Sequence, residues 1–273
     1  FLEQRDLDEN TIVIFMNDNG VTEGLDVYNA GMRGCKATVW QGGTRAMSFW
    51  KWPGNWEPNT VDSLTAHLDV LPTLCQLAGA EIPGKVQDEL EGYSLLPLLQ
   101  GNTWEHGSRY LFQNVGRWPA GTAASHKYAM CAVRKGNYLL LRSAECEDPV
   151  CENFQSQCTT MRAVRNGLTT TTYAYGTAQE HWGVTAPGHW MLVDVKKDPA
   201  CKNDLSKAYP ELVSELVAAY DTWWEEQYPV MIARGGDVGD PQESAKAAEL
   251  SRQAKAAVEA RKAAAQQAAG GAE

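Results

Sequence analysis

The first hundred residues alternate between short apolar runs and polar turns. Residues 11–16 (TIVIFM) are apolar and rich in β-branched side chains, which is typical of a strand buried on both faces in a parallel sheet. Residues 1–7 resemble the last turns of an amphipathic helix, and residues 8–10 the turn that follows it. A helix, a turn and a buried strand make up half of a βαβ unit, so we expect a preceding strand outside this sequence.

A second apolar pattern repeats at helical spacing further along the chain. Asp69 stands where an N-cap is expected, Pro72 lies in the first turn, and Gly79 is a stop signal. We therefore predict a packing helix here, with Asp69 as its cap rather than as a catalytic acid. The apolar positions that define its buried face are Leu68, Leu71, Leu74 and Ala78.

From about residue 108 the pattern changes to short strands and one long helix. Residues 135–137 (KGN) predict a hairpin turn, and residues 209–227 predict a helix that begins beside Pro210. We expect a small antiparallel sheet with a packed C-terminal helix. The predicted strands are residues 110–112, 128–133, 138–141 and 191–195.

Two segments lack such patterns. Residues 143–181 form a long polar insertion, and loops of this length are usually functional or disordered. Residues 235–273 are rich in alanine and carry no apolar stripe, so we predict a helical or disordered tail without a catalytic role.

The seven cysteines show no C-x-x-C spacing, which argues against a structural zinc site. Cys146, Cys151 and Cys158 cluster inside the polar insertion. A disulfide-clamped loop in an oxidising compartment and a set of free thiols are both compatible with this cluster.

Charge and hydropathy exclude some partners. The formal net charge is −10, so a nucleic acid or an anionic membrane surface would be repelled at long range. No segment approaches the roughly 20 consecutive apolar residues of a transmembrane helix. We therefore expect neither a nucleic-acid partner nor a membrane partner, although an enzyme for anionic esters remains compatible with this charge.

Candidate chemistry begins directly after the first predicted strand. Asp18 and Asn19 offer one charged and one neutral hard oxygen at a strand end, where open α/β sheets place ligand-binding groups. Such a pair suits calcium or magnesium better than zinc. Taken alone, Asp-Asn-Gly is also an ordinary turn sequence.

Further motifs follow in a fixed order: D-N-G at 18–20, K-x-x-x-W-Q-G-G-x-R at 36–45, W-P-G at 52–54, H-L-D-V-L-P-T-L at 67–74 and E-G-Y-S-L-L-P-L-L at 91–99. With these motifs the sequence closely resembles the sulfatase family of the alkaline-phosphatase superfamily, over roughly residues 1–232. The resemblance implies an α/β fold, namely the C-terminal part of the sulfatase mixed-sheet sandwich followed by a small antiparallel sheet with a packed helix.

The resemblance also implies a division of the chain. Residues 1–107 would form the C-terminal half of the catalytic α/β domain. Residues 108–234 would form the small antiparallel-sheet subdomain, with its insertion at about 143–181. Residues 235–273 would be the alanine-rich tail.

The resemblance assigns roles to individual residues. Asp18 and Asn19 match two ligands of one calcium ion, and Lys36 matches the lysine that contacts the sulfate group and its bridging oxygen. A divalent cation and a positioned ammonium would stabilise the charge that develops during S–O cleavage, by about 3 kcal/mol per preorganised donor.

The segment after Lys36 matches the family's structural residues near the site. Arg45 is expected to pair structurally, and Gly42 and Gly43 are expected to be structural residues near the site. Gln41 departs from the family pattern, because it stands where a glutamate is usual. That change removes a negative charge beside the predicted site.

Other polar and aromatic residues have simpler interpretations. The five histidines show no metal-ligand spacing, so each is expected to be a loop or core histidine rather than a ligand. The tryptophans at 40, 50, 52 and 56 suit either core packing, which is favoured, or the lining of an aryl pocket.

The family's nucleophile is absent from this sequence. It is a formylglycine made from the first residue of a C/S-x-P-x-R motif, and no cysteine or serine here begins such a motif. We therefore expect the formylglycine and the remaining calcium ligands in a missing N-terminal half, and we expect the chain to be an inactive fragment without it.

In the complete protein the implied function is hydrolysis of aryl or carbohydrate sulfate esters, in the periplasm or outside the cell. Two alternatives stay open. One is a non-catalytic sulfatase-like binding protein, which the Gln41 departure favours. The other is a phosphoesterase or phosphonate hydrolase of the same superfamily, although these usually carry Asp-His and zinc where this chain has Asp18 and Asn19.

Overall fold

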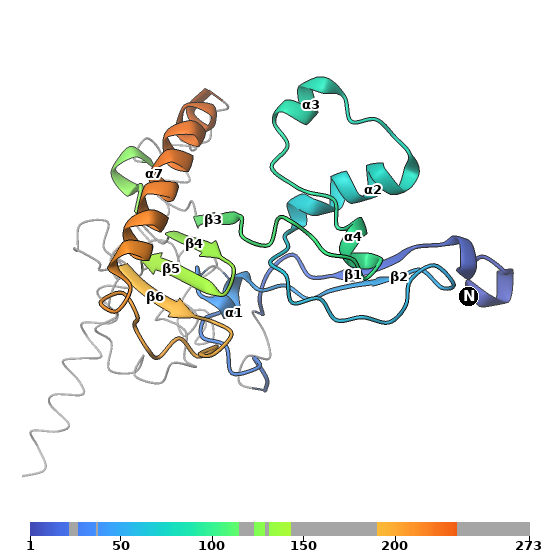
Figure 1. Cartoon of the computed structure of the whole chain (residues 1–273), viewed down its shortest axis with the longest axis horizontal. Coiled ribbons are helices and arrows are strands. Elements are labelled where there is room, and N and C mark those ends of the chain that lie inside the picture. The colour runs from blue at the N-terminus through green and yellow to red at the C-terminus, as the bar shows by residue number, and fades with distance from the viewer. Residues whose placement is uncertain (22–26, 37, 115–122, 129–130, 143–189, 234–273) are drawn as a thin grey trace, which may run out of the picture. The chain divides into compact units, whose positions relative to one another are not determined.

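A computed structural model of the chain describes residues 1–21, 27–36, 38–114, 123–128, 131–142 and 190–233 (Figure 1). The chain divides into two compact units. The first comprises residues 1–20, 45–111 and 135–137, and the second comprises residues 21–44, 112–134 and 138–273. Residues 21–44, which the sequence analysis grouped with the first region, therefore fold with the second unit. The domain boundaries of the complete protein remain a prediction.

The first unit begins with two 3-10 turns, η1 (Glu3–Arg5) and η2 (Asp8–Asn10), rather than the end of an α-helix. Strand β1 (Val13–Met16) follows and pairs with β2 (Ser48–Lys51). The two strands run antiparallel, with Val13 opposite Lys51 and Met16 opposite Ser48. The predicted strand is present, but the predicted parallel pairing is not found among the described residues.

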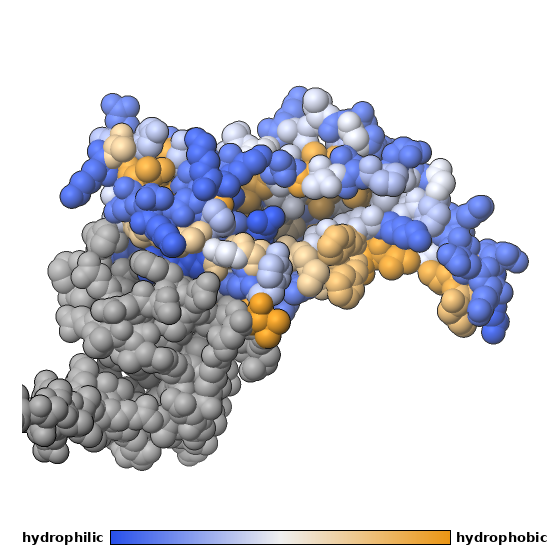
Figure 2. All heavy atoms as spheres, turned by 90° about the horizontal axis from the view of Figure 1, so that it is seen from below, coloured by the Kyte–Doolittle hydropathy of each residue, from blue (hydrophilic) through white to orange (hydrophobic). Residues whose placement is uncertain are grey.

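Burial of β1 on both faces is also not observed. Alternate side chains of β1 are exposed, as are three of the four in β2. The Phe15 and Phe49 rings lie 6.4 Å apart, and each is 62% exposed. Hydrophobic side chains are visible on the molecular face drawn in Figure 2. An all-apolar strand is exposed here because, within the described chain, its only pairing partner is β2.

The helices of the first unit follow β2. The predicted helix is α2 (Val70–Ala78), and it ends as expected at Gly79, whose φ of 61° is readily adopted by glycine. A 3-10 turn, η3 (His67–Asp69), precedes α2 directly. Two short helices complete this region, α3 (Gly84–Asp88) and α4 (Leu96–Leu99).

The second unit is built on a four-stranded sheet in the order β3-β4-β5-β6. Strands β5 and β6 run antiparallel, and β4 and β5 are joined by the predicted turn at 136–137. The sheet confirms the predicted strands, although β4 begins three residues later than expected. The bounds are β3 (Tyr110–Asn114), β4 (Cys131–Lys135), β5 (Tyr138–Arg142) and β6 (Trp190–Asp194).

One face of this sheet is covered by α7 (Pro210–Ala233), which extends six residues beyond the predicted end of the helix (Figure 1). Leu216, Tyr220 and Trp224 of α7 pack against the buried residues Val133, Leu140 and Leu192 of the sheet. Since successive side chains of a strand point to opposite faces, the intervening residues of the strands form a second core on the other side.

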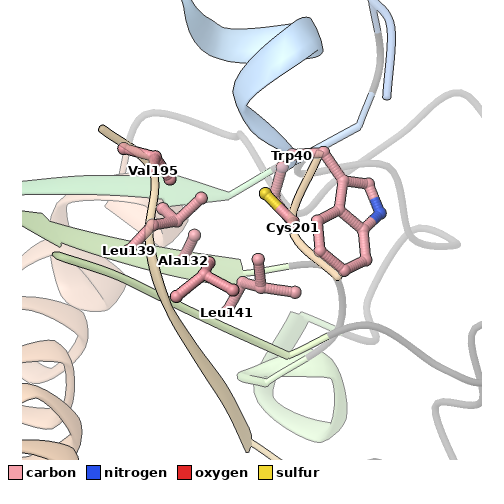
Figure 3. Packing of buried hydrophobic residues seen from close by; sticks show 8 residues of the cluster. Trp40, Ala132, Leu139, Leu141, Val195 and Cys201 are labelled. Carbon is pink, nitrogen blue, oxygen red and sulfur yellow. The ribbon is translucent and has the colours of Figure 1, made fainter. Parts of the chain in front are cut away.

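This second core contains residues that precede α1 (Gln41–Thr44). Val39 and Trp40 pack with Ala132, Leu139, Leu141, Val193, Val195 and Cys201. Figure 3 shows the Trp40 ring and the Cys201 thiol beside the strand side chains. The loop that carries the predicted sulfatase motif is therefore anchored on the small sheet.

Several predictions lie outside the described residues. These are the insertion at 143–181, the cysteines within it and the tail at 235–273. The remaining described element is the 3-10 turn η4 (Ala123–His126). Within the described ranges no helix combines the length and apolar character needed to cross a membrane.

Candidate functional site

Asp18 and Asn19 lie directly after β1, as predicted. Asp18 is exposed and Asn19 is half-buried. The residue before them is fixed on both sides, because the Asn17 N–H donates to the Met47 carbonyl (3.1 Å) and the Asn17 carbonyl lies 2.7 Å from His67 Nε2. The end of the β1–β2 ladder thus presents the two candidate ligands from a tethered backbone.

The donor chemistry of this pair fits a hard cation in part. One carboxylate and one amide supply oxygens of the kind that calcium prefers, but calcium takes six to eight oxygen ligands. Among the described residues no group of three or more His, Cys, Asp or Glu side chains lies close enough to hold a metal ion. Asp18 and Asn19 therefore fit as two ligands of a site that needs others.

Lys36 lies on a loop of the second unit and its side chain is exposed. Its backbone is held firmly, because its N–H donates to the Val21 carbonyl (3.0 Å) and its carbonyl accepts from the Cys35 thiol (3.3 Å). Cys35 is 1% exposed and is fixed in turn by Thr38, whose hydroxyl accepts from the Cys35 N–H (3.2 Å) and donates to the Cys35 carbonyl (2.7 Å). A rigid backbone thus carries an exposed ammonium group, the arrangement expected for an electrostatic contact.

The loop before Lys36 folds around one side-chain amide. Asn29 Nδ2 donates to the carbonyls of Met32 (2.8 Å) and Gly34 (3.0 Å). Gly42 packs against the same turn, since its N–H donates to the Arg33 carbonyl at 2.7 Å. A Cβ at position 42 would overlap the Gly34 and Arg33 carbonyl oxygens, so only glycine allows this approach.

Arg33 fastens this loop to the small sheet. Its guanidinium stacks 3.7 Å from the Trp40 ring and donates from Nη1 to the Cys201 carbonyl (3.3 Å), while its N–H donates to the Pro199 carbonyl (3.1 Å). Burial lowers the pKa of Arg33, which nevertheless stays protonated as arginines in proteins do. Arg33 is thus a structural cation rather than a candidate ligand for sulfate.

Gln41, the departure from the family pattern, is 5% exposed. Its Oε1 is buried and has no hydrogen-bond partner among the described residues. A glutamate at this position would place a negative charge in a site that favours the neutral form, whereas an amide avoids that cost. Packing at position 41 thus survives without the salt bridge that a glutamate would require.

Arg45 follows α1 and is exposed. It forms no ion pair within the part of the chain that the structure describes, so the predicted structural pairing would need residues outside that part. Gly43, by contrast, is buried beside the Cys35 and Thr38 carbonyls as expected for close packing.

The structure describes the candidate site in two separate parts. Asp18 and Asn19 belong to the first unit, and Lys36, Gln41, Gly42 and Gly43 belong to the second. Each part presents its polar group from a hydrogen-bonded backbone. Convergence of the two parts on one sulfate group remains a prediction.

Asp69 occupies the N-cap position of α2, as the sequence predicts, but its side chain does not cap that helix. Instead Oδ1 and Oδ2 each accept from the Arg109 guanidinium at 2.6 Å, and they also accept from the N–H groups of Tyr93 (3.0 Å) and Ala66 (2.7 Å). The sequence thus predicts the position of Asp69 correctly, but it does not predict that the carboxylate pairs with Arg109, which is 40 residues away.

The four tryptophans are divided between the two units. Trp40 is buried in the core of the second unit, whereas Trp50, Trp52 and Trp56 belong to the first. Trp52 and Trp56 contact each other edge to face at 5.4 Å, and Trp52 Nε1 donates to the Glu9 carbonyl at 3.0 Å. These contacts favour packing, the first of the two interpretations.

Comparison with known proteins identifies the class. The family model described as Sulfatase matches residues 1–80, so this part of the chain is a sulfatase-family sequence and the predicted resemblance is confirmed there. Human arylsulfatase A is 40% identical over 97 residues, which are 34% of this chain and 18% of that protein. Mouse steryl-sulfatase is 32% identical over 137 residues, which are 45% of this chain and 22% of that protein.

Solved structures agree on the fold. A Bacteroides thetaiotaomicron protein studied for glycosaminoglycan metabolism superposes with a TM-score of 0.53 at 22% identity, covering 81% of this chain and 40% of that chain. Ps i-CgsB in complex with k-i-k-neocarrahexaose gives a TM-score of 0.52 at 19% identity, covering 81% and 38%. Together with the observed helices and antiparallel sheets, these neighbours confirm the α/β class and the C-terminal part of the sulfatase fold.

The chain spans about a fifth of the length of these curated relatives and about two fifths of these structural neighbours.

Proposed function

We propose that this chain is the C-terminal part of a longer calcium-dependent sulfatase that hydrolyses sulfate esters. The observation that carries the proposal is the pair of hard oxygen ligands at the end of β1, within the residues that match the sulfatase family. The short share of each relative that the chain covers supports a longer protein, whose preceding part would supply the formylglycine and the other calcium ligands.

In this proposal Asp18 and Asn19 bind the calcium ion through a carboxylate and an amide oxygen. The ion, when bound, polarises the sulfate group as a Lewis acid. Lys36 contributes a second positive charge, placed by the fixed backbone of residues 35 and 36, and donates a hydrogen bond to the oxygen that departs when the S–O bond breaks.

The substrate class in this proposal is an aryl or carbohydrate sulfate. An arylsulfatase is among the relatives, and one structural neighbour was solved with a bound oligosaccharide. We propose a periplasmic or extracellular location from the family resemblance. The N-terminal part of the same protein is the partner that the chain requires for activity.

The test is the substitution Asp18→Ala in the complete protein, matured to formylglycine and assayed with p-nitrophenyl sulfate. Loss of a charged calcium ligand should abolish hydrolysis and calcium binding while the circular dichroism spectrum is kept. Asp88→Ala is the matched control, because Asp88 is an exposed acid of the same unit at the end of α3. Wild-type turnover by Asp18→Ala would refute the assignment.

A further inference from the structure

The peptide group that precedes Asp18 is held by a histidine from another part of the first unit. His67 Nε2 lies 2.7 Å from the Asn17 carbonyl oxygen, across 50 residues of sequence. We infer that His67 is a positioning residue for the calcium ligands Asp18 and Asn19, an inference that rests on the proposed function.

The chemistry of the contact fixes the histidine tautomer. A carbonyl oxygen only accepts hydrogen bonds, so Nε2 must carry the proton and donate it. The peptide group between Asn17 and Asp18 is planar, so holding its oxygen also sets the direction of the Asp18 N–H and the position of the Asp18 Cα. His67 thereby restricts where the Asp18 carboxylate points.

The other side of Asn17 is held by the sheet. Its N–H donates to the Met47 carbonyl at 3.1 Å, one residue beyond the β1–β2 ladder. The backbone entering Asp18 is therefore fixed by one bond to the β2 side and one to His67. Loss of the His67 bond would remove one of these two restraints, and the ligand pair would sample more orientations.

His67 itself stands on a rigid turn. It is the first residue of η3, where the Asp69 N–H donates to the Ala66 carbonyl (3.0 Å) and the Ala66 N–H donates to Asp69 Oδ2 (2.7 Å). Asp69 is fully buried and paired with Arg109. The ion pair therefore holds the turn, and the turn presents the His67 ring to Asn17.

A role as a direct ligand is disfavoured for His67. Calcium takes oxygen ligands rather than ring nitrogens, and the His67 Nε2 N–H is already used by the Asn17 carbonyl. Residues that orient metal ligands through hydrogen bonds, without binding the metal themselves, typically contribute about 10–100-fold to metal affinity. Because the His67 bond is exposed, we expect the low end of that range.

The experiment measures calcium binding directly. The complete protein is stripped with a chelator and titrated with calcium in a calorimeter, as wild type, His67→Ala, His67→Gln and Leu68→Ala. His67→Ala should weaken the calcium Kd by about tenfold. His67→Gln should recover most of the affinity, because the glutamine amide places a donor near the position of Nε2. Leu68→Ala, a neighbour in the same turn that is 48% exposed, should bind like wild type.

Kinetics separate positioning from loss of fold. The calcium concentration for half-maximal hydrolysis of p-nitrophenyl sulfate should rise with the Kd in His67→Ala, while kcat at saturating calcium stays close to that of wild type. Wild-type calcium affinity in His67→Ala, or no recovery in His67→Gln, would overturn the inference and leave the proposed function intact. A wild-type protein that binds no calcium would overturn both.

Discussion

Arg109 offers the sharpest test of how the first unit is held together. The change is Arg109→Met, which keeps much of the side-chain volume and removes the charge. In the structure the Arg109 and Asp69 side chains are 7% and 0% exposed, and two hydrogen bonds of 2.6 Å join them. After the substitution the Asp69 carboxylate would stay buried with only the Ala66 and Tyr93 N–H groups as partners.

Breaking a buried pair by removing one partner typically costs about 3–5 kcal/mol, because an uncompensated charge remains buried. The second loss is aromatic, since the guanidinium also lies over the Trp104 ring (5.4 Å) and the Tyr93 ring (5.6 Å). We expect Arg109→Met to lower the free energy of unfolding of the complete protein by this full amount, as measured by urea denaturation. Hydrogen exchange should show faster exchange at the Ala66 and Tyr93 amides.

The control is Lys127→Met, which breaks the Lys127–Asp221 pair of the second unit. That pair is 2.8 Å long, but its side chains are 22% and 33% exposed, so its loss should cost less than about 1 kcal/mol. The reasoning from burial would be refuted if the two substitutions lowered the free energy of unfolding equally. It would also be refuted if Arg109→Met stayed within about 1 kcal/mol of wild type.

Two further predictions concern the second unit. Lys36→Ala in the complete protein should lower kcat by roughly 10²–10³-fold, with a smaller loss for aryl sulfates whose leaving groups are more acidic. An equal loss of kcat for all leaving groups would indicate instead that Lys36 binds sulfate equally in the ground state and the transition state. Burial raises the pKa of the Cys131 thiol to about 12, so iodoacetamide at pH 8 should leave native Cys131 unmodified while it labels the half-buried Cys75, as read by peptide mass spectrometry. In the unfolded chain the Cys131 thiol has its ordinary pKa of about 8.5. Between about pH 8.5 and pH 12 the thiol therefore ionises only in the unfolded chain, so the free energy of unfolding should fall as pH rises through this range. Labelling of both thiols at one rate would contradict this prediction.

The small sheet was predictable because its signals are local. β5 and β6 lie within one residue of the predicted segments, since apolar residues there fill both faces and a Gly-Asn turn separates β4 from β5. β4 begins later because Tyr128 is not a strand residue. Its hydroxyl donates instead to Asp221 of α7 at 2.5 Å, a partner 93 residues away.

β1 shows that an apolar pattern predicts a strand but not its pairing or its burial. A run such as residues 11–16 fits a strand in either kind of sheet, and its pairing depends on which strands lie beside it. Within this chain the neighbour is β2, so the pair is antiparallel and Phe15 stays exposed.

The sequence predicts the local elements that carry the candidate site residues, but not the contacts that hold those elements in place. The strand end before Asp18 and the loop that carries Lys36 follow from local sequence. The contacts that hold these residues, from His67 to Asn17 and from Arg109 to Asp69, join positions 50 and 40 residues apart. Sequence spacing does not predict pairs so far apart, because folding alone brings their residues together.

The most direct test of the central claim is the metal and ester preference of the complete, formylglycine-containing protein. Initial rates are measured with p-nitrophenyl sulfate and p-nitrophenyl phosphate, after chelation and after adding back calcium or zinc. The account predicts hydrolysis of the sulfate ester that is lost on chelation and restored by calcium. Faster hydrolysis of the phosphate ester, restored by zinc and not by calcium, would contradict it.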